Sequence, residues 1–278
     1  MMLNVNGAAT YAYTGGKSFD PARPTVVMIH GVLNDHSVWA LQSRYLANHG
    51  FNVLAIDLPG HCRSQGEAPA SVEAAADFIG ALLDAAGVQQ AALVGHSWGS
   101  LIAMEAAARF PERISHLVLV GTAFPMKVSP ALIQASLEEP EKALRMVNVF
   151  SRSTLAAPPS ALGPGTWVYG AGMALGWRVL RSNAAGQRGG EGFRCVFHQR
   201  SATLERRGAF RAQGLHHVLI GDAPVAARSC DRFDVDAFGF GKLERFGADR
   251  AVGDDLLRLA RGCCGSSRIG KCLSQYII

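Results

Sequence analysis

The sequence has few cysteines in its first two thirds, no long apolar run, and no histidine after His217. Cys62 stands alone before residue 183, which is typical of a reducing compartment and excludes a disulfide-built scaffold in that part. The chain shows neither the basic start and apolar run of a signal peptide nor a stretch long enough to cross a membrane. We therefore expect a cytoplasmic protein without a membrane span. The later cysteines match no metal-ligand spacing, so neither a metal nor a cofactor is expected.

Charged side chains are also scarce, and they are unevenly distributed. They make up 18% of the 278 residues, and the formal net charge is +5. Residues 1–182 carry 12 basic and 12 acidic side chains, whereas residues 183–278 carry 15 and 10, so the whole excess lies in the last third. The arginines there are scattered among acidic residues and form no known nucleic-acid motif. We expect a small-molecule substrate and no nucleic-acid partner, and the sequence indicates no oligomeric state.

Short apolar runs alternate with helical patterns between residues 24 and 124. Two helices are expected, one over 37–49 with Gly50 as its C-cap and one over 71–86 with Ser71 as its N-cap. The apolar runs are continuous rather than alternating, as in parallel strands with helices on both faces. They cover residues 25–29, 52–56, 91–94 and 116–120. This order predicts an α/β fold with an open, mostly parallel sheet.

The segment Gly95-His96-Ser97-Trp98-Gly99 is a G-x-S-x-G pattern between an apolar run and an alanine-rich helical run. A strand that turns sharply into a helix holds the turn residue at strained backbone angles, and its neighbours must be small because the backbones pack closely. The turn lifts the serine oxygen clear of the sheet and directs the helix N-terminus at it, which favours developing negative charge. A plain glycine-rich turn is the alternative, but strand, turn and helix occur in the order that a nucleophilic serine requires.

With these features, the chain resembles the α/β-hydrolase family, in the subgroup with a cap. The resemblance implies that Ser97 is the nucleophile and that the backbone amides of Val32 and Trp98 form the oxyanion hole. Cys62 replaces a glycine that is usual in the family, and a negative φ would accommodate its side chain. The matching motifs lie within residues 24–124: His30-Gly31, Asp57-Leu58-Pro59-Gly60-His61 with Arg63-Ser64, Gly95 to Gly99, and Phe110-Pro111-Glu112-Arg113-Ile114.

The chain divides into three expected segments. Residues 1–125 would form the α/β-hydrolase core with the nucleophile turn, residues 126–182 a helical cap, and residues 183–278 an atypical, irregular and poorly ordered segment. Within the cap, helices are expected over 130–137 and 140–150. A breaker-rich loop and an aromatic, glycine-rich stretch (166–177) follow. The aromatic residues either roof an apolar acyl pocket or pack the cap onto the core.

The last segment lacks a residue that the resemblance requires. The family would supply a strand that ends in a catalytic aspartate and, later, a catalytic histidine. Residues 215–222 fit the strand, which makes Asp222 the candidate acid, but no histidine follows His217. A serine hydrolase needs an imidazole to take and return the hydroxyl proton. A divergent domain, a basic nucleic-acid-binding appendage and a shifted reading frame are three possible origins. The abrupt gain of Arg, Gly and Cys together with the missing histidine favours the shifted frame.

Two functions therefore stay open. The first is a serine-dependent α/β hydrolase that cleaves a carboxylic ester or a related acyl bond of a small apolar substrate. The second is a catalytically impaired relic that binds at most an apolar ligand under its cap. Serine at position 97 argues against the dehalogenase and epoxide-hydrolase branches, which in the family attack through a carboxylate.

Overall fold

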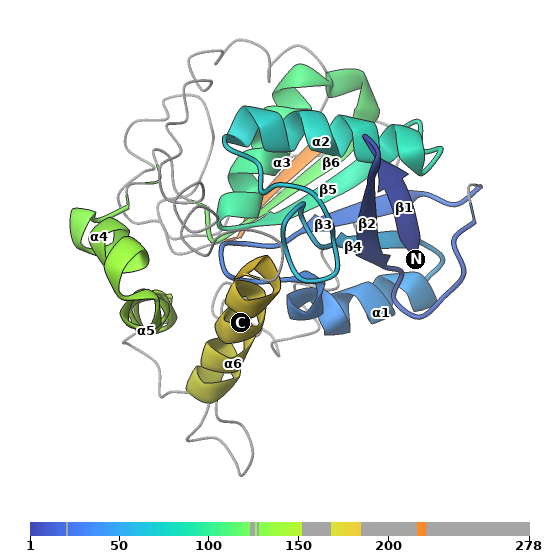
Figure 1. Cartoon of the computed structure of the whole chain (residues 1–278). Helices are drawn as coiled ribbons and strands as arrows, with labels where there is room; N and C mark the ends of the chain where they lie inside the picture. The colour runs from blue at the N-terminus through green and yellow to red at the C-terminus, as the bar shows by residue number, and fades with distance from the viewer. Residues whose placement is uncertain (21, 123–125, 127, 152–167, 185–215, 221–278) are drawn as a thin grey trace, which may run out of the picture.

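The computed structural model describes residues 1–20, 22–122, 126, 128–151, 168–184 and 216–220 (Figure 1). These residues form one sheet with the strand order β1-β2-β4-β3-β5-β6-β7. The first two strands form an antiparallel hairpin at one edge, and β3 to β7 run parallel to one another. The strands are β1 (Met2–Val5), β2 (Ala8–Tyr13), β3 (Thr25–Ile29), β4 (Asn52–Ile56), β5 (Ala91–His96), β6 (Ile114–Val120) and β7 (His216–Ile220).

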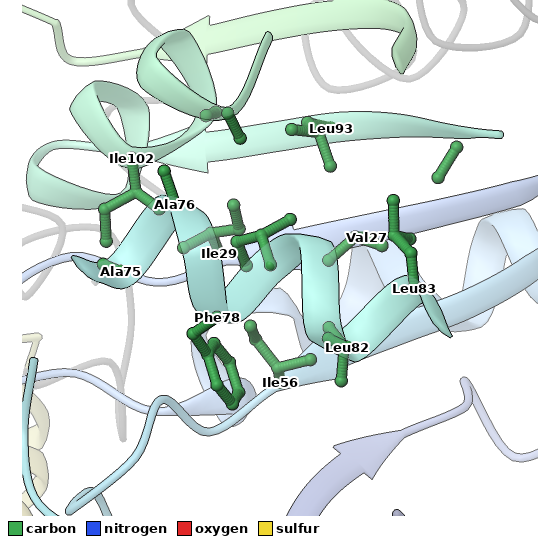
Figure 2. Packing of buried hydrophobic residues seen from close by; sticks show 14 of the residues in the cluster. Val27, Ile29, Ile56, Ala75, Ala76, Phe78, Leu82, Leu83, Leu93 and Ile102 are labelled. Carbon is green, nitrogen blue, oxygen red and sulfur yellow. The ribbon is translucent and has the colours of Figure 1, made fainter. Parts of the chain in front are cut away.

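Helices cover both faces of this sheet, which confirms the predicted α/β fold. The helices α2 (Val72–Ala85) and α3 (Trp98–Arg109) pack on one face, and α1 (Ala40–Asn48) packs on the other. Side chains alternate between the two layers along β5: Leu93 joins the α2–α3 layer, whereas Ala92 and Val94 join the α1 layer. Figure 2 shows the α2–α3 layer, with the side chains of α2 against those of β3, β4 and β5.

The ends of the core helices follow the expected caps with one difference. Ser71 caps α2, and its Oγ accepts a hydrogen bond from the amide of Ala74 at 3.1 Å. Gly50 follows α1 with a φ of +91°, as expected for a C-terminal glycine. The expected helix over 37–49 begins instead as a 3-10 turn, η1 (His36–Trp39), before α1. A second 3-10 turn, η2 (Pro111–Arg113), connects α3 to β6.

The cap lies at one end of the sheet and consists of α4 (Pro130–Glu138), α5 (Pro140–Phe150) and α6 (Val168–Ala184) (Figure 1). The first two helices match the predicted ones, and α6 shows that the aromatic, glycine-rich stretch is helical from Val168 on. A Cβ atom added at Gly176 would lie 2.3 Å from Cδ2 of Leu144, so α5 and α6 approach closely at that glycine. No helix of the described parts combines the length and the apolarity needed to cross a membrane.

The strand expected over 215–222 is present as β7, which pairs in parallel with β6 and places Val218 beside Val118. The candidate acid Asp222 lies outside the described residues. So do the expected loop between α5 and α6 and, apart from the end of α6 and β7, the segment 183–278.

Candidate active site

Ser97 stands between β5 and α3 in a strained backbone conformation, with φ +51° and ψ −119°. Such a conformation in a residue other than glycine costs about 1–3 kcal/mol and persists only where surrounding contacts fix it. Two hydrogen bonds do so here. The amide of Ser97 donates to the carbonyl oxygen of Val120 at 2.9 Å, and the amide of Ser100 donates to the carbonyl oxygen of Ser97 at 2.9 Å. The structure therefore contains the sharp strand-to-helix turn that the sequence predicts.

The glycines on either side of Ser97 are required by close contacts between backbones. A Cβ atom added at Gly95 would lie 2.3 Å from the carbonyl oxygen of Gly99. A Cβ atom added at Gly99 would lie 2.4 Å from the carbonyl oxygen of Ile29, at the end of β3. Both distances are shorter than van der Waals contact, so a side chain at either position would displace α3 from the sheet. The G-x-S-x-G pattern is thus explained by packing around the serine.

The loop after β3 passes directly beside Ser97. A Cβ atom added at Gly31 would lie 3.1 Å from Cβ of Ser97, which brings the candidate oxyanion residue Val32 into the immediate neighbourhood of the nucleophile. Trp98, the other candidate, is the first residue of α3, and its amide belongs to the helix N-terminus. The N-terminus of a helix carries a partial positive charge, which favours negative charge beside it. The fold therefore places Val32 and Trp98 next to Ser97.

His30 holds the start of this loop. Its side chain is fully buried, and its Nε2 accepts a hydrogen bond from the amide of Leu58 at 3.1 Å. Its Nδ1 lies 2.8 Å from the carbonyl oxygen of Gly31, to which the neutral ring donates. Burial, and secondarily the neighbouring His61, lowers the pKa of His30 to about 4. His30 is thus a neutral structural residue that connects the loops after β3 and β4.

His96 precedes the nucleophile in sequence, but its side chain lies on the α1 side of the sheet. It continues the alternation of Ala92 and Val94, and its ring lies edge-on to Trp39 with the ring centroids 6.5 Å apart. Burial lowers the pKa of His96 to about 4. Within the described parts of the chain, no hydrogen bond joins Ser97 to an imidazole. Neither His30 nor His96 is therefore in place to act as a base for Ser97.

Asp57, at the end of β4, organises the polar surroundings of the site. Its carboxylate is fully buried and accepts hydrogen bonds from the amide and Nδ1 of His36, both at 2.8 Å, and from the amide of Arg63 at 3.2 Å. Possible metal ligands of Asp35, His36 and Asp57 lie within 4.8 Å of one another. Both carboxylates already accept hydrogen bonds, and the guanidinium of Arg178 lies 2.6 Å from Asp35, which opposes a cation. We interpret the cluster as structural.

Cys62 does not have the negative φ that would accommodate its side chain without strain, because its φ is +43°. Its thiol donates to Oδ2 of Asp35 at 3.2 Å, and its amide donates to Oγ of Ser182 on α6 at 3.0 Å. These contacts on both sides hold the left-handed conformation that a glycine would adopt without strain. Burial and the Asp35 carboxylate raise the pKa of the Cys62 thiol to about 12, so the thiol remains a neutral donor. Sequence reasoning missed this contact between core and cap.

The buried neutral state of His30 predicts an acid-sensitive fold. The unfolded chain binds a proton near pH 6.5 and the folded chain near pH 4, so the unfolded state gains protons first as pH falls through this window. The free energy of unfolding should therefore decrease between pH 6.5 and 4, by about 3 kcal/mol from this group. Urea unfolding of His30→Asn should show a flatter pH dependence than wild type, whereas His49→Asn, at an exposed site, should not. Identical slopes for all three proteins would contradict this role.

Comparison with known proteins adds sequence relatives. Residues 24–156 match the family model of the alpha/beta hydrolase fold. Lipase LipV of Mycobacterium tuberculosis is 35% identical over 123 residues, which are 44% of this chain and 46% of the relative. Epoxide hydrolase B of the same species is 33% identical over 127 residues, 44% of this chain and 35% of that protein. The chain spans less than half the length of these curated relatives.

Solved structures share the fold at low sequence identity. An enol-lactonase from Burkholderia xenovorans LB400 is similar with a TM-score of 0.62 and 20% identity, over 82% of this chain and 83% of that one. An esterase from Exiguobacterium antarcticum is similar with a TM-score of 0.59 and 15% identity, over 79% of this chain and 80% of that one. At such identities the likeness concerns the fold alone.

Proposed function

Because residues 24–156 belong to the α/β-hydrolase fold family, we propose that this protein is a serine hydrolase that cleaves a carboxylic ester or a related acyl bond of a small apolar substrate. One observation carries the proposal. Ser97 is held at φ +51° at the N-terminus of α3, with the Gly31 backbone against its Cβ atom. This is the arrangement that an exposed nucleophile beside an oxyanion hole requires.

In the proposed reaction, Oγ of Ser97 attacks the acyl carbon while its proton passes to a base. The carbonyl oxygen becomes an oxyanion, which accepts hydrogen bonds from the amides of Val32 and Trp98. Each such donor typically contributes about 3–4 kcal/mol of transition-state stabilisation. Collapse of the tetrahedral intermediate expels the alcohol and leaves an acyl-serine, which water then hydrolyses. Asp222 is the proposed acid of the triad, and no histidine in this sequence follows it.

Two observations support an acyl substrate. Ser97 offers a hydroxyl, whereas the resemblance implies a carboxylate nucleophile in epoxide hydrolases and dehalogenases. A lipase is among the curated relatives. The apolar character of the substrate rests on the cap, where partly buried apolar side chains gather. They include Leu132, Ile133, Met146, Met173 and Trp177, and Val32 of the loop after β3 packs against the same cluster.

A serine-directed phosphonate tests this proposal without requiring multiple turnovers. We expect a fluorophosphonate with a short alkyl chain to form one covalent adduct on the chain, because Oγ of Ser97 displaces fluoride from phosphorus while its proton passes to a base, and the adduct needs no deacylation step. Intact mass should increase by one phosphonyl group, and peptide mapping should locate it on Ser97. The variant Ser18→Ala, which removes an exposed serine, should label like wild type.

The second candidate function is a relic that binds an apolar ligand without catalysis, and the missing histidine favours it. The same experiment separates the two candidates. An adduct on Ser97 supports the hydrolase. Saturable binding of an apolar fluorescent probe, without any adduct after prolonged incubation with the phosphonate, would support the relic and overturn the first proposal.

A further inference from the structure

The loop between β3 and η1 is held by the core at one end and by the cap at the other. Its first residues, His30 and Gly31, contact the core next to Ser97. Its next residues, Val32 and Leu33, belong to an apolar cluster of the cap, and Asp35 forms an ion pair with Arg178 of α6 at 2.6 Å. The candidate oxyanion amide of Val32 therefore lies between these two attachments.

Leu33 has an uncommon conformation for a bulky residue, with φ +58°. Its side chain is only 8% exposed, and it joins Ala135 of α4 and Ala143 and Leu144 of α5 in a buried cluster, here called the cap cluster. Met173 and Trp177 of α6 pack against the same cluster. All three cap helices thus surround the residue that follows Val32. Burial of the leucine in the cap explains how the left-handed backbone is maintained.

Asp35 connects the same loop to the cap through polar contacts. Its side chain is 1% exposed and accepts hydrogen bonds from the amide of Ser37 at 2.8 Å and from the thiol of Cys62 at 3.2 Å, besides its contact with Arg178. Arg178 also donates to Oγ of Ser37 at 2.8 Å. The apolar and polar attachments lie two residues apart, so displacement of the cap would pull on the loop at both points.

We infer that the cap sets the geometry of the oxyanion hole, with Leu33 as a positioning residue whose anchorage in the cap cluster directs the Val32 amide toward Ser97. The inference rests on the proposed function for its catalytic meaning. Gly31 is fixed against Ser97 and Leu33 is fixed in the cap, so the backbone between them has little freedom. A cap held in place by a fitting substrate would complete the oxyanion hole, and a displaced cap would disorganise it.

Two substitutions at position 33 separate the apolar anchor from the backbone conformation. Leu33→Met keeps an apolar side chain of similar volume, whereas Leu33→Asn suits a positive φ but removes the anchor. At saturating phosphonate, the rate constant for labelling of Ser97 should fall about tenfold to a hundredfold in Leu33→Asn, because one oxyanion donor is misplaced. The half-saturating concentration should change less than about threefold, as expected when ground-state binding is retained. Leu33→Met should label like wild type.

Equal labelling by wild type and Leu33→Asn, equal impairment of both variants, or a change confined to the half-saturating concentration would each overturn the inference. A residue that served only to keep the protein folded would lower the labelled fraction and leave the rate constant of the folded fraction unchanged. The comparison of rate constant with labelled fraction therefore distinguishes positioning from stability.

Hydrogen exchange tests the coupling even if Ser97 never reacts. Leu144→Ala removes a buried side chain of the cap cluster, and Val149→Ala, on the same helix, changes a half-exposed residue outside it. Amide exchange in a peptide covering residues 31–36 should accelerate several-fold in Leu144→Ala and stay unchanged in Val149→Ala, while β5 stays protected. If Leu144→Ala fails to fold, Arg178→Gln, at a half-exposed side chain, replaces it with the same expectation. Unchanged exchange over 31–36 would overturn the coupling, whereas absent labelling with accelerated exchange would overturn only the proposed function.

Discussion

Replacement of Ser97 by alanine should abolish formation of the acyl-enzyme and therefore the ester hydrolysis that proceeds through it. The turn holds only this hydroxyl at the end of β5, and the side chain of His96 lies in the α1 layer with Trp39. The measurement is the pre-steady-state burst of aryl alcohol from a short-chain aryl ester, with the acyl adduct followed by intact mass. Without a histidine after Asp222, turnover by the present chain should already be low, and whatever burst, adduct and serine-dependent turnover it shows should be absent in Ser97→Ala.

Two controls accompany this substitution: the stability of Ser97→Ala itself and the burst of a variant that lacks another serine. Ser97→Ala keeps the amides of Val32 and Trp98 and the packing of Gly95 and Gly99, so its thermal unfolding should match wild type or exceed it slightly. Ser18→Ala should retain the burst. A burst that survives in Ser97→Ala would place the nucleophile outside this turn and would contradict the proposed function.

The core of the fold was predictable because its signals are local. Continuous apolar runs such as Val26 to Ile29 are typical of strands that helices cover on both faces, and the structure buries them in two layers. The cap of α2 at Ser71 depends on one side chain and the amide of Ala74. The nucleophile turn was predictable for the same reason, since its glycines and its serine lie within five residues.

The N-terminal hairpin also has a local signal in the sequence, which lies in its turn. Asn6 and Gly7 separate β1 from β2, and both have positive φ values of +52° and +83°. Asn-Gly between short strands is the characteristic sequence of a two-residue hairpin turn, because both positions need a left-handed backbone. The strands themselves are short and only partly buried, so their hydrophobic pattern alone did not reveal them.

The contacts between cap and core could not be predicted from local patterns. Arg178 and Asp35 are separated by 143 positions, and nothing in either neighbourhood specifies the other. The positive φ of Cys62 follows from the same interface, because Ser182 of α6 and Asp35 fix the cysteine from two sides. Leu33 likewise owes its left-handed conformation to a cluster built from distant helices. Tertiary packing overrides the preference of a single residue at each of these positions.

The largest expected effect is a gain of activity. Translation of the alternative reading frame after Ala185 should restore an ending that carries a histidine and raise ester turnover by about a thousandfold or more, because a positioned imidazole would then take the proton of Ser97. The measurement is turnover of one aryl ester by both proteins at equal folded concentration. An uninterrupted frame in the nucleotide sequence around codons 180–195, confirmed in a second isolate, would argue against the shift before any protein is made.

A double-mutant cycle tests whether this gain in turnover depends on the triad. If the restored histidine acts through Ser97, the gain should vanish in Ser97→Ala, since members of a triad act as a unit and their effects do not add. A gain that persists without Ser97 would arise from better folding or from another site. Conversely, turnover near 10 s⁻¹, about the median for enzymes, by the chain with its present sequence would show that one of its nine histidines already serves as the base. The interpretation of residues 183–278 as a shifted frame would then be wrong, and His216 and His217 on β7 would be the first positions to substitute.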